Sequence, residues 1–137
     1  MIEFKDLPDT TTPINADNLN NNFDKLKPYV LYNDTNGSSV SITLSDSAQN
    51  YEYLEIFFEA EDVYRSEKIF SPNNKIVDCN INVLFGDANY YKNSKWQISG
   101  LTISATAGNA YAINIYGFND FATSTNQVYI HRVVGYK

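Results

Sequence analysis

Cysteine, histidine, tryptophan and methionine each occur only once among the 137 residues. With Cys79 as the single thiol, no disulfide within the chain can form, and one thiol with one histidine cannot assemble a Cys-rich zinc site. Cys79 falls at an apolar position of an alternating run, so we expect a buried thiol of low reactivity. We therefore predict no metal site and no cofactor.

Basic residues and long apolar runs are also scarce. Ten Lys and Arg oppose sixteen Asp and Glu, giving a formal net charge of −6, and the basic residues do not cluster. Phosphate neutralisation needs clustered cations, so neither nucleic acid nor an anionic membrane surface is expected as a partner. No apolar run approaches the ~20 residues that span a bilayer, and residues 1–7 lack the apolar core of a signal peptide. We expect synthesis in a cytoplasm without a signal peptide.

Recognisable catalytic groups are missing from the sequence. The lone His131 lies in a predicted strand without a metal-spaced partner, and no nucleophile elbow, phosphate loop or dinucleotide fingerprint occurs. Glu59, Glu61 and Asp62 form a dense acidic cluster without calcium-loop spacing, which favours a solvated hairpin tip. Glu52, Glu55 and Glu59 give only a weak case for a glycosidase pair. The sequence therefore predicts a protein that is not an enzyme.

The first 28 residues differ in pattern from the rest of the chain. Two prolines and several polar turn residues in residues 1–14 predict an extended arm that must lie against a partner. We expect this arm to attach the chain through its apolar and proline side chains: Phe4, Leu7, Pro8, Pro13 and Ile14.

A short helix is predicted from about Ala16 to Lys27, with Asn15 as its N-cap and Pro28 after its end. Its sequence is rich in asparagine, a poor helix former, so packing must stabilise it. Its large apolar residues are spaced by four and then three positions, which places them on one narrow stripe. This stripe could pack against the chain's own sheets or against identical helices of sister chains: Leu19, Phe23 and Leu26.

From Tyr29 onward the apolar pattern has period two and no second helix is indicated. Val40, Ile42 and Leu44 are expected to point inward in one run, and Leu54, Ile56 and Phe58 in the next. A change of phase at Gly100 indicates a bulge or sharp bend, and Asn33 to Gly37 read as a turn. About seven or eight strands predict an all-β fold, an antiparallel β-sandwich or jelly roll covering residues 29–137.

The 11 tyrosines and 8 phenylalanines exceed what a core of this size needs, so some rings should face a partner. Tyr51, Tyr53 and Phe57 alternate with the inward set of their run and are expected to lie between subunits. Three further aromatic residues near a polar loop are predicted to contact a ligand such as a sugar, unless the tryptophan fills the core: Tyr90, Tyr91 and Trp96.

The stretch from Glu3 to Asn20, EFKDLPDTTTPINADNLN, resembles the opening of small structural proteins of bacteriophages that infect Gram-positive bacteria. This resemblance covers about the first 26 residues. It implies a tail-fibre, baseplate or minor structural protein, usually a homotrimer, whose N-terminus docks on a larger phage structural protein. The chain is short for a complete fibre, which leaves contact with the host surface open.

The sequence is compatible with three functions. The first is a non-enzymatic virion protein: a homotrimer with the helical stripe on its threefold axis, located on the particle. The second is a monomeric carbohydrate-binding module for host cell-wall polymers, which a monomeric mass and saccharide-dependent quenching of Trp96 would favour. The third, a small polysaccharide hydrolase, would require turnover that is lost when Glu55 or Glu59 is replaced.

Overall fold

The computed structural model describes residues 16–85, 88–114, 117–122 and 127–137. Within these residues a single α-helix, α1 (Ala16–Leu26), precedes nine strands. The strands, with a 3-10 turn η1 (Ala48–Asn50) before the third, are β1 (Tyr29–Ser38), β2 (Ser41–Thr43), β3 (Tyr53–Ala60), β4 (Val63–Phe70), β5 (Ile76–Phe85), β6 (Ala88–Ser99), β7 (Thr102–Asn114), β8 (Gly117–Ala122) and β9 (Tyr129–Tyr136). The predicted all-β fold with one short helix is confirmed.

The strands form two antiparallel sheets that pack face to face. Sheet A has the order β1-β9-β3-β4, and sheet B has the order β2-β7-β6-β5. One edge of β7 pairs with β6 along its length, while its other edge pairs with β2 at one end and with β8 at the other. The architecture is therefore a β-sandwich in which sheet B is the larger layer.

The core lies between the two inner faces. Sheet A contributes Leu54, Ile56 and Phe58 from β3, as the alternation predicted, and all three are almost fully buried. Sheet B contributes the apolar residues of β5, including Cys79, which is 0% exposed. Burial raises the pKa of the Cys79 thiol well above its usual range, so this side chain acts as a small apolar residue.

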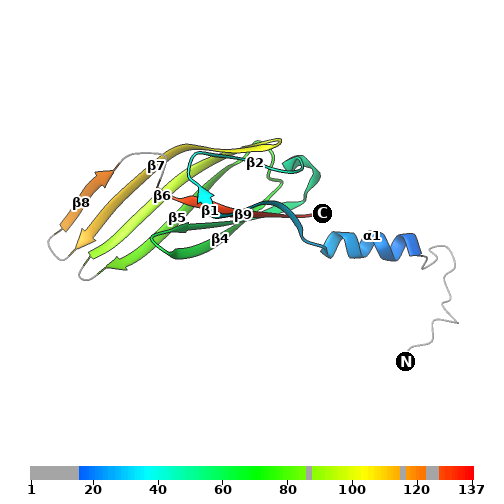
Figure 1. Ribbon diagram of the computed structural model, residues 1–137, viewed down its shortest axis with the longest axis horizontal. Coiled ribbons are helices and arrows are strands. Elements are labelled where there is room, and N and C mark those ends of the chain that lie inside the picture. Colours follow the sequence, from blue (N-terminus) through cyan, green and yellow to red (C-terminus); the bar gives the residue numbers. More distant parts are fainter. Residues whose placement is uncertain (1–15, 86–87, 115–116, 123–126) are drawn as a thin grey trace, which may run out of the picture.

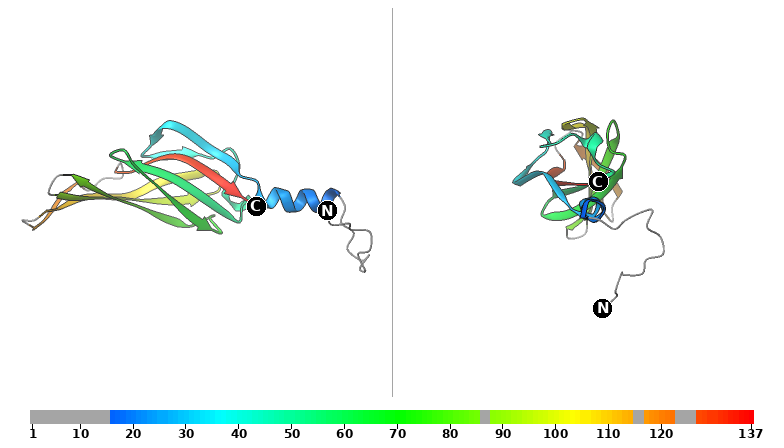
Figure 2. Two further views of the ribbon diagram at one scale, coloured as in Figure 1. Left: turned by 90° about the horizontal axis from the view of Figure 1, so that it is seen from below. Right: turned by 90° about the vertical axis from the view of Figure 1, so that its right-hand side faces the viewer.

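The two ends of the sandwich differ. Figure 1 shows α1 extending from one end, beside the C-terminus, while the ends of β5 to β8 extend past sheet A at the opposite end. Figure 2 confirms that α1 continues away from the sandwich instead of folding back on a sheet. The molecule therefore has a helix-bearing end and an end that is one sheet thick.

The expected turn at Asn33 to Gly37 is instead part of β1. Its pairing with β9 loses register between Asn33 and Ser38, and there Asn36 donates its backbone N–H to Asp34 Oδ1 at 2.9 Å. Gly37 adopts the left-handed region at φ 71°. The turn residues thus form an irregularity within a strand, because pairing resumes beyond them at Ser38.

Two further local expectations concern Val40, which differs from the structure, and Gly100, where the structure has the expected sharp bend. Val40 is 65% exposed, because it lies in the bend before β2 and the alternation begins only at Ser41; Ile42 and Leu44 are buried as expected. Gly100, expected at a bulge or sharp bend, occupies the tight turn between β6 and β7. It has φ 56° while Ser99 pairs with Thr102, a conformation that glycine adopts without strain.

The tip of the β3–β4 hairpin contains two strained residues. Glu61 and Asp62 have φ angles of 51° and 61° between the paired residues Ala60 and Val63, the pattern of a type I′ turn. Both side chains are exposed, and Glu61 pairs with Lys92 of β6. The predicted solvated hairpin tip is confirmed for Glu61 and Asp62, whereas Glu59 lies within β3 and its side chain is largely buried.

Replacing Asp62 with glycine should raise the free energy of unfolding by about 0.5 kcal/mol, because glycine adopts a positive φ without the steric cost paid by an L side chain. Urea denaturation of the wild type and the variant measures the change. Asp62→Ala is the matched control and should not be stabilising, because alanine keeps the steric cost. A less stable Asp62→Gly protein would contradict a strained turn.

Candidate functional site

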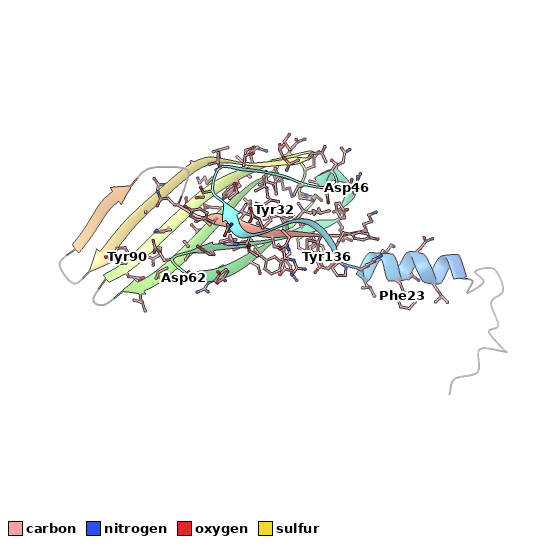
Figure 3. The ribbon with its side chains drawn as sticks, in the orientation of Figure 1. Phe23, Tyr32, Asp46, Asp62, Tyr90 and Tyr136 are labelled. Carbon is pink, nitrogen blue, oxygen red and sulfur yellow. The ribbon has the colours of Figure 1, made fainter. Side chains whose placement is uncertain are left out.

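The apolar stripe of α1 has no partner among the described residues of the sandwich. Leu19, Phe23 and Leu26 are 45%, 66% and 76% exposed, and Figure 3 shows the labelled Phe23 projecting from a helix with no sheet beside it. Of the two alternatives left open by the sequence, packing of the stripe on the chain's own sheets does not occur. Three large apolar side chains therefore face solvent on a helix that needs packing to be stable.

A cluster of tyrosines and lysines joins α1 to the sandwich; we call it the junction cluster, and it consists of Lys27, Tyr29, Tyr51 and Lys137. The Lys27 Nζ lies 5.5 Å from the centroid of the Tyr29 ring, and the Lys137 Nζ lies 4.8 Å from the same centroid and 5.7 Å from that of Tyr51. The two rings are tilted with centroids 5.8 Å apart. These cation–π and aromatic contacts connect the exit of the helix to the C-terminal residue.

Tyr51 was expected on the outer face of sheet A, and this expectation is wrong. The residue is 6% exposed, because β3 begins only at Tyr53 and the alternation does not extend back through Glu52. The Tyr51 ring lies against Gly135 of β9, where a Cβ atom would come within 2.4 Å of Tyr51 Cδ1. Tyr51 is therefore the core residue of the junction cluster and does not lie on an outer face.

The Tyr51 hydroxyl is fixed by an acidic partner. It donates a hydrogen bond to Asp46 Oδ2 at 2.9 Å, and Asp46 Oδ1 accepts from the Ser47 backbone and from Asn50. Burial, followed by the hydrogen bond to Asp46, raises the pKa of Tyr51 to about 12. The hydrogen bond from Tyr51, followed by that from the Ser47 backbone, lowers the pKa of Asp46.

The raised pKa of Tyr51 predicts a loss of stability at high pH. The stabilisation that the protonated Tyr51 hydroxyl contributes is fully present below the ordinary tyrosine pKa of 10.0. It is lost as the pH rises toward the folded-state pKa of about 12. The free energy of unfolding should therefore fall by about 2 kcal/mol more in the wild type than in Tyr51→Phe over that range. Urea denaturation from about pH 8 to about pH 12 tests this. Parallel profiles for the two proteins would contradict it.

The outer face of sheet A carries a set of aromatic side chains, which we call the aromatic face: Tyr53, Phe57, Tyr64, Phe70 and Tyr136. Tyr53 of β3 stacks on Tyr136 of β9 at 4.6 Å between ring centroids, and it contacts Phe70 of β4 at 5.0 Å. Lys68 Nζ lies 5.7 Å from the Tyr53 centroid. The predicted outward positions of Tyr53 and Phe57 are therefore correct, and both residues are half-buried.

The rest of this face continues along the strands. Arg132 of β9 lies over the Phe57 ring at 5.9 Å, while Tyr64 and Phe70 are 62% and 55% exposed. Tyr64, Phe70 and Tyr136 were not predicted as site residues. The sequence of β4 has no apolar alternation, and the pairing that places Phe70 and Tyr136 on either side of Tyr53 is not visible in a single strand. Aromatic rings and arginine are typical of protein interfaces.

His131 has a structural environment on the same sheet. Its Nδ1 lies 3.1 Å from the Asp34 carbonyl oxygen and therefore donates its proton to it. Its Nε2 lies 3.8 Å from Glu59 Oε2, and its ring contacts that of Tyr64. The hydrogen bond to Asp34 connects β9 to the irregular part of β1.

The residues expected to contact a ligand are not brought together. Trp96 is 0% exposed in the core, so its assignment as a ligand contact is wrong and the alternative of a core position holds. Tyr90 and Tyr91 are consecutive residues of β6 and point to opposite faces of sheet B, because side chains alternate along a strand. The three rings therefore cannot form one binding surface.

The predictions about attachment residues, metal ligands and membrane spans can be compared with the structure only where the chain is described. The attachment residues Phe4, Leu7, Pro8, Pro13 and Ile14 lie outside the described residues.

Among residues 16–85, 88–114, 117–122 and 127–137, no cluster of three or more metal-ligating side chains occurs. In the same part of the chain, no helix is long and apolar enough to cross a membrane.

Comparisons with known proteins give no family assignment: no protein-family model matches the chain, and no curated protein matches it. Two apolar surfaces of the structure, the stripe of α1 and the aromatic face, are therefore the features that indicate a function, together with the sequence of residues 1–14.

Proposed function

We propose that this chain is a non-enzymatic structural protein of a bacteriophage particle, an appendage of the tail-fibre or baseplate type. Residues 1–14 dock on a larger phage structural protein, and the β-sandwich projects outward. The protein is located in the virion. The resemblance of its first 26 residues to the opening of such proteins supports this assignment.

The observation that carries the proposal is the exposed stripe of α1. A helix of 11 residues rich in asparagine is marginal in isolation, yet it extends from the sandwich with its large apolar side chains in solvent. Association of identical helices along this stripe buries these side chains. A homotrimer with Leu19, Phe23 and Leu26 on the threefold axis satisfies the requirement.

The aromatic face supplies a second surface for contact between subunits. Tyr53 and Phe57 lie on it, and the exposed Tyr64 and Phe70 extend it. In an ordinary sandwich the outer face of a sheet is polar, whereas this one combines five aromatic side chains with the charged residues Glu55, Lys68 and Arg132. Burial of this face between adjacent sandwiches explains its composition.

The mass of the full chain in solution tests the proposal directly. Sedimentation equilibrium should give three times the mass of the chain, and a protein lacking residues 1–28 should have a lower association state and should not bind particles. A full chain that remains monomeric at high concentration would refute assembly through α1.

A further inference from the structure

A row of carboxamide side chains crosses the outer face of sheet B, on the opposite side of the sandwich from the aromatic face. Asn80 of β5, Asn93 of β6 and Asn109 of β7 occupy directly paired positions, so they succeed one another about 4.8 Å apart. Asp78 and Asn82 lie two residues to either side of Asn80 on β5. We call Asp78, Asn80, Asn82, Asn93 and Asn109 the carboxamide face.

Asn93 holds this surface in a defined arrangement. Although it lies on an outer face, it is only 9% exposed, and its Nδ2 donates hydrogen bonds to Asp78 Oδ1 and to Asn80 Oδ1, the latter at 2.6 Å. Asp78 and Asn80 are themselves exposed. One buried amide therefore orients two exposed side chains before any ligand arrives.

The orientation leaves complementary groups for a further partner. Asp78 uses Oδ1 toward Asn93 and retains Oδ2 as an acceptor, while Asn80 uses Oδ1 and retains Nδ2 as a donor. A hydroxyl group both donates and accepts hydrogen bonds, so two adjacent hydroxyls of a sugar ring match an acceptor and a donor held side by side. Tyr91 occupies the next row opposite Asn82, and tyrosine combines an apolar ring with a polar group.

We propose that the carboxamide face binds a neutral saccharide, a function beyond assembly of the particle. The surface has no excess of positive charge that would favour an anionic ligand over a neutral one. Its one carboxylate, Asp78, lies directly opposite Lys95, and the central row is uncharged. A divalent cation would need more oxygen ligands with charge than a single aspartate supplies. A protein partner would be expected to meet aromatic and apolar side chains instead.

A single flat site of this kind binds weakly. A monosaccharide of about twelve non-hydrogen atoms should bind with a dissociation constant of about 1 mM. Three such faces on one assembly would bind a polymer of the same sugar far more tightly, because the second and third contacts are intramolecular. Each chain carries a complete site, so binding of the monosaccharide does not depend on trimer formation.

Nuclear magnetic resonance of the full, isotope-labelled chain tests the proposal through the side-chain amide signals of asparagine. Glucose, galactose and N-acetylglucosamine are titrated separately, with glycerol as the control polyol. At least one sugar should shift the amide signals of Asn80 and Asn93 saturably, whereas glycerol should not. Asn80→Ala and Asp78→Asn should each weaken binding about tenfold, as expected for one lost hydrogen bond. Asn33→Ala, an exposed amide on sheet A, should leave binding unchanged.

The proposal is overturned if no sugar shifts these signals, if glycerol shifts them equally, or if both variants bind as the wild type does. A carboxamide row that only ties the strands together would give this result, with Asn80→Ala less stable and the wild-type titration flat. The association state, measured on the same samples, reports separately on the proposed assembly: a monomer that binds sugar refutes the trimer and retains the site.

Discussion

Replacing Phe23 with aspartate is expected to dissociate the proposed homotrimer into folded monomers. Phe23 is 66% exposed in the single chain, and burying such a ring contributes about 2 kcal/mol per chain. Three chains lose this contribution together and also place three carboxylates near one axis. The association constant of the trimer should therefore fall at least 10⁴-fold, corresponding to about 6 kcal/mol. Sedimentation equilibrium of the wild type and the variant over a range of concentrations measures the change.

Asn21→Asp is the matched control, because it adds the same charge to the same helix on another face. Asn21 is exposed and follows Leu19 by two residues, which places it about 200° around the helix from the stripe. It should leave the mass unchanged. If both variants dissociate the assembly, charge alone is responsible. If neither does, the stripe is not the subunit contact and another surface holds the chains together.

Local periodicity predicted much of the fold. The stripe spacing in α1 and the alternation of Leu54, Ile56 and Phe58 each depend on residues close in sequence, and the structure confirms both. The boundary at Pro28 is equally local, because proline removes the backbone donor that a helix requires. These features needed no knowledge of which strands pair.

The features that were predicted wrongly or missed depend on where a strand begins and on which strands pair with it. Tyr51 fits the alternation of β3 but precedes the strand, so its ring turns under β9 instead of outward. Tyr64, Phe70 and Tyr136 became part of the aromatic face only through pairing of β4 and β9 with β3. The carboxamide row likewise arises from three strands, and no single segment shows it.

Replacing Gly135 with alanine should have the largest effect on the stability of the sandwich itself. The added Cβ atom would lie 2.4, 2.7 and 2.8 Å from three atoms of the Tyr51 ring, closer than carbon atoms pack. That ring is 6% exposed and its hydroxyl donates a hydrogen bond to Asp46. The ring therefore cannot move without losing its core packing and this hydrogen bond. The free energy of unfolding should fall by about 3 kcal/mol, as expected for an overpacked core, and urea denaturation measures it.

A double-mutant cycle with Tyr51→Ala separates this clash from any other effect of the glycine. Removing the ring eliminates the atoms that the Cβ would meet, so Gly135→Ala should cost almost nothing in that background, and the coupling free energy should reach about 3 kcal/mol. Additive effects would instead show that Gly135 is needed for its backbone and not for the space above it. The same ring contacts Tyr29 and Lys137, so a Cβ atom that displaces the ring would also disturb the contacts at the exit of α1. Loss of trimer in Gly135→Ala, with Phe23 intact, would then follow from a displaced helix.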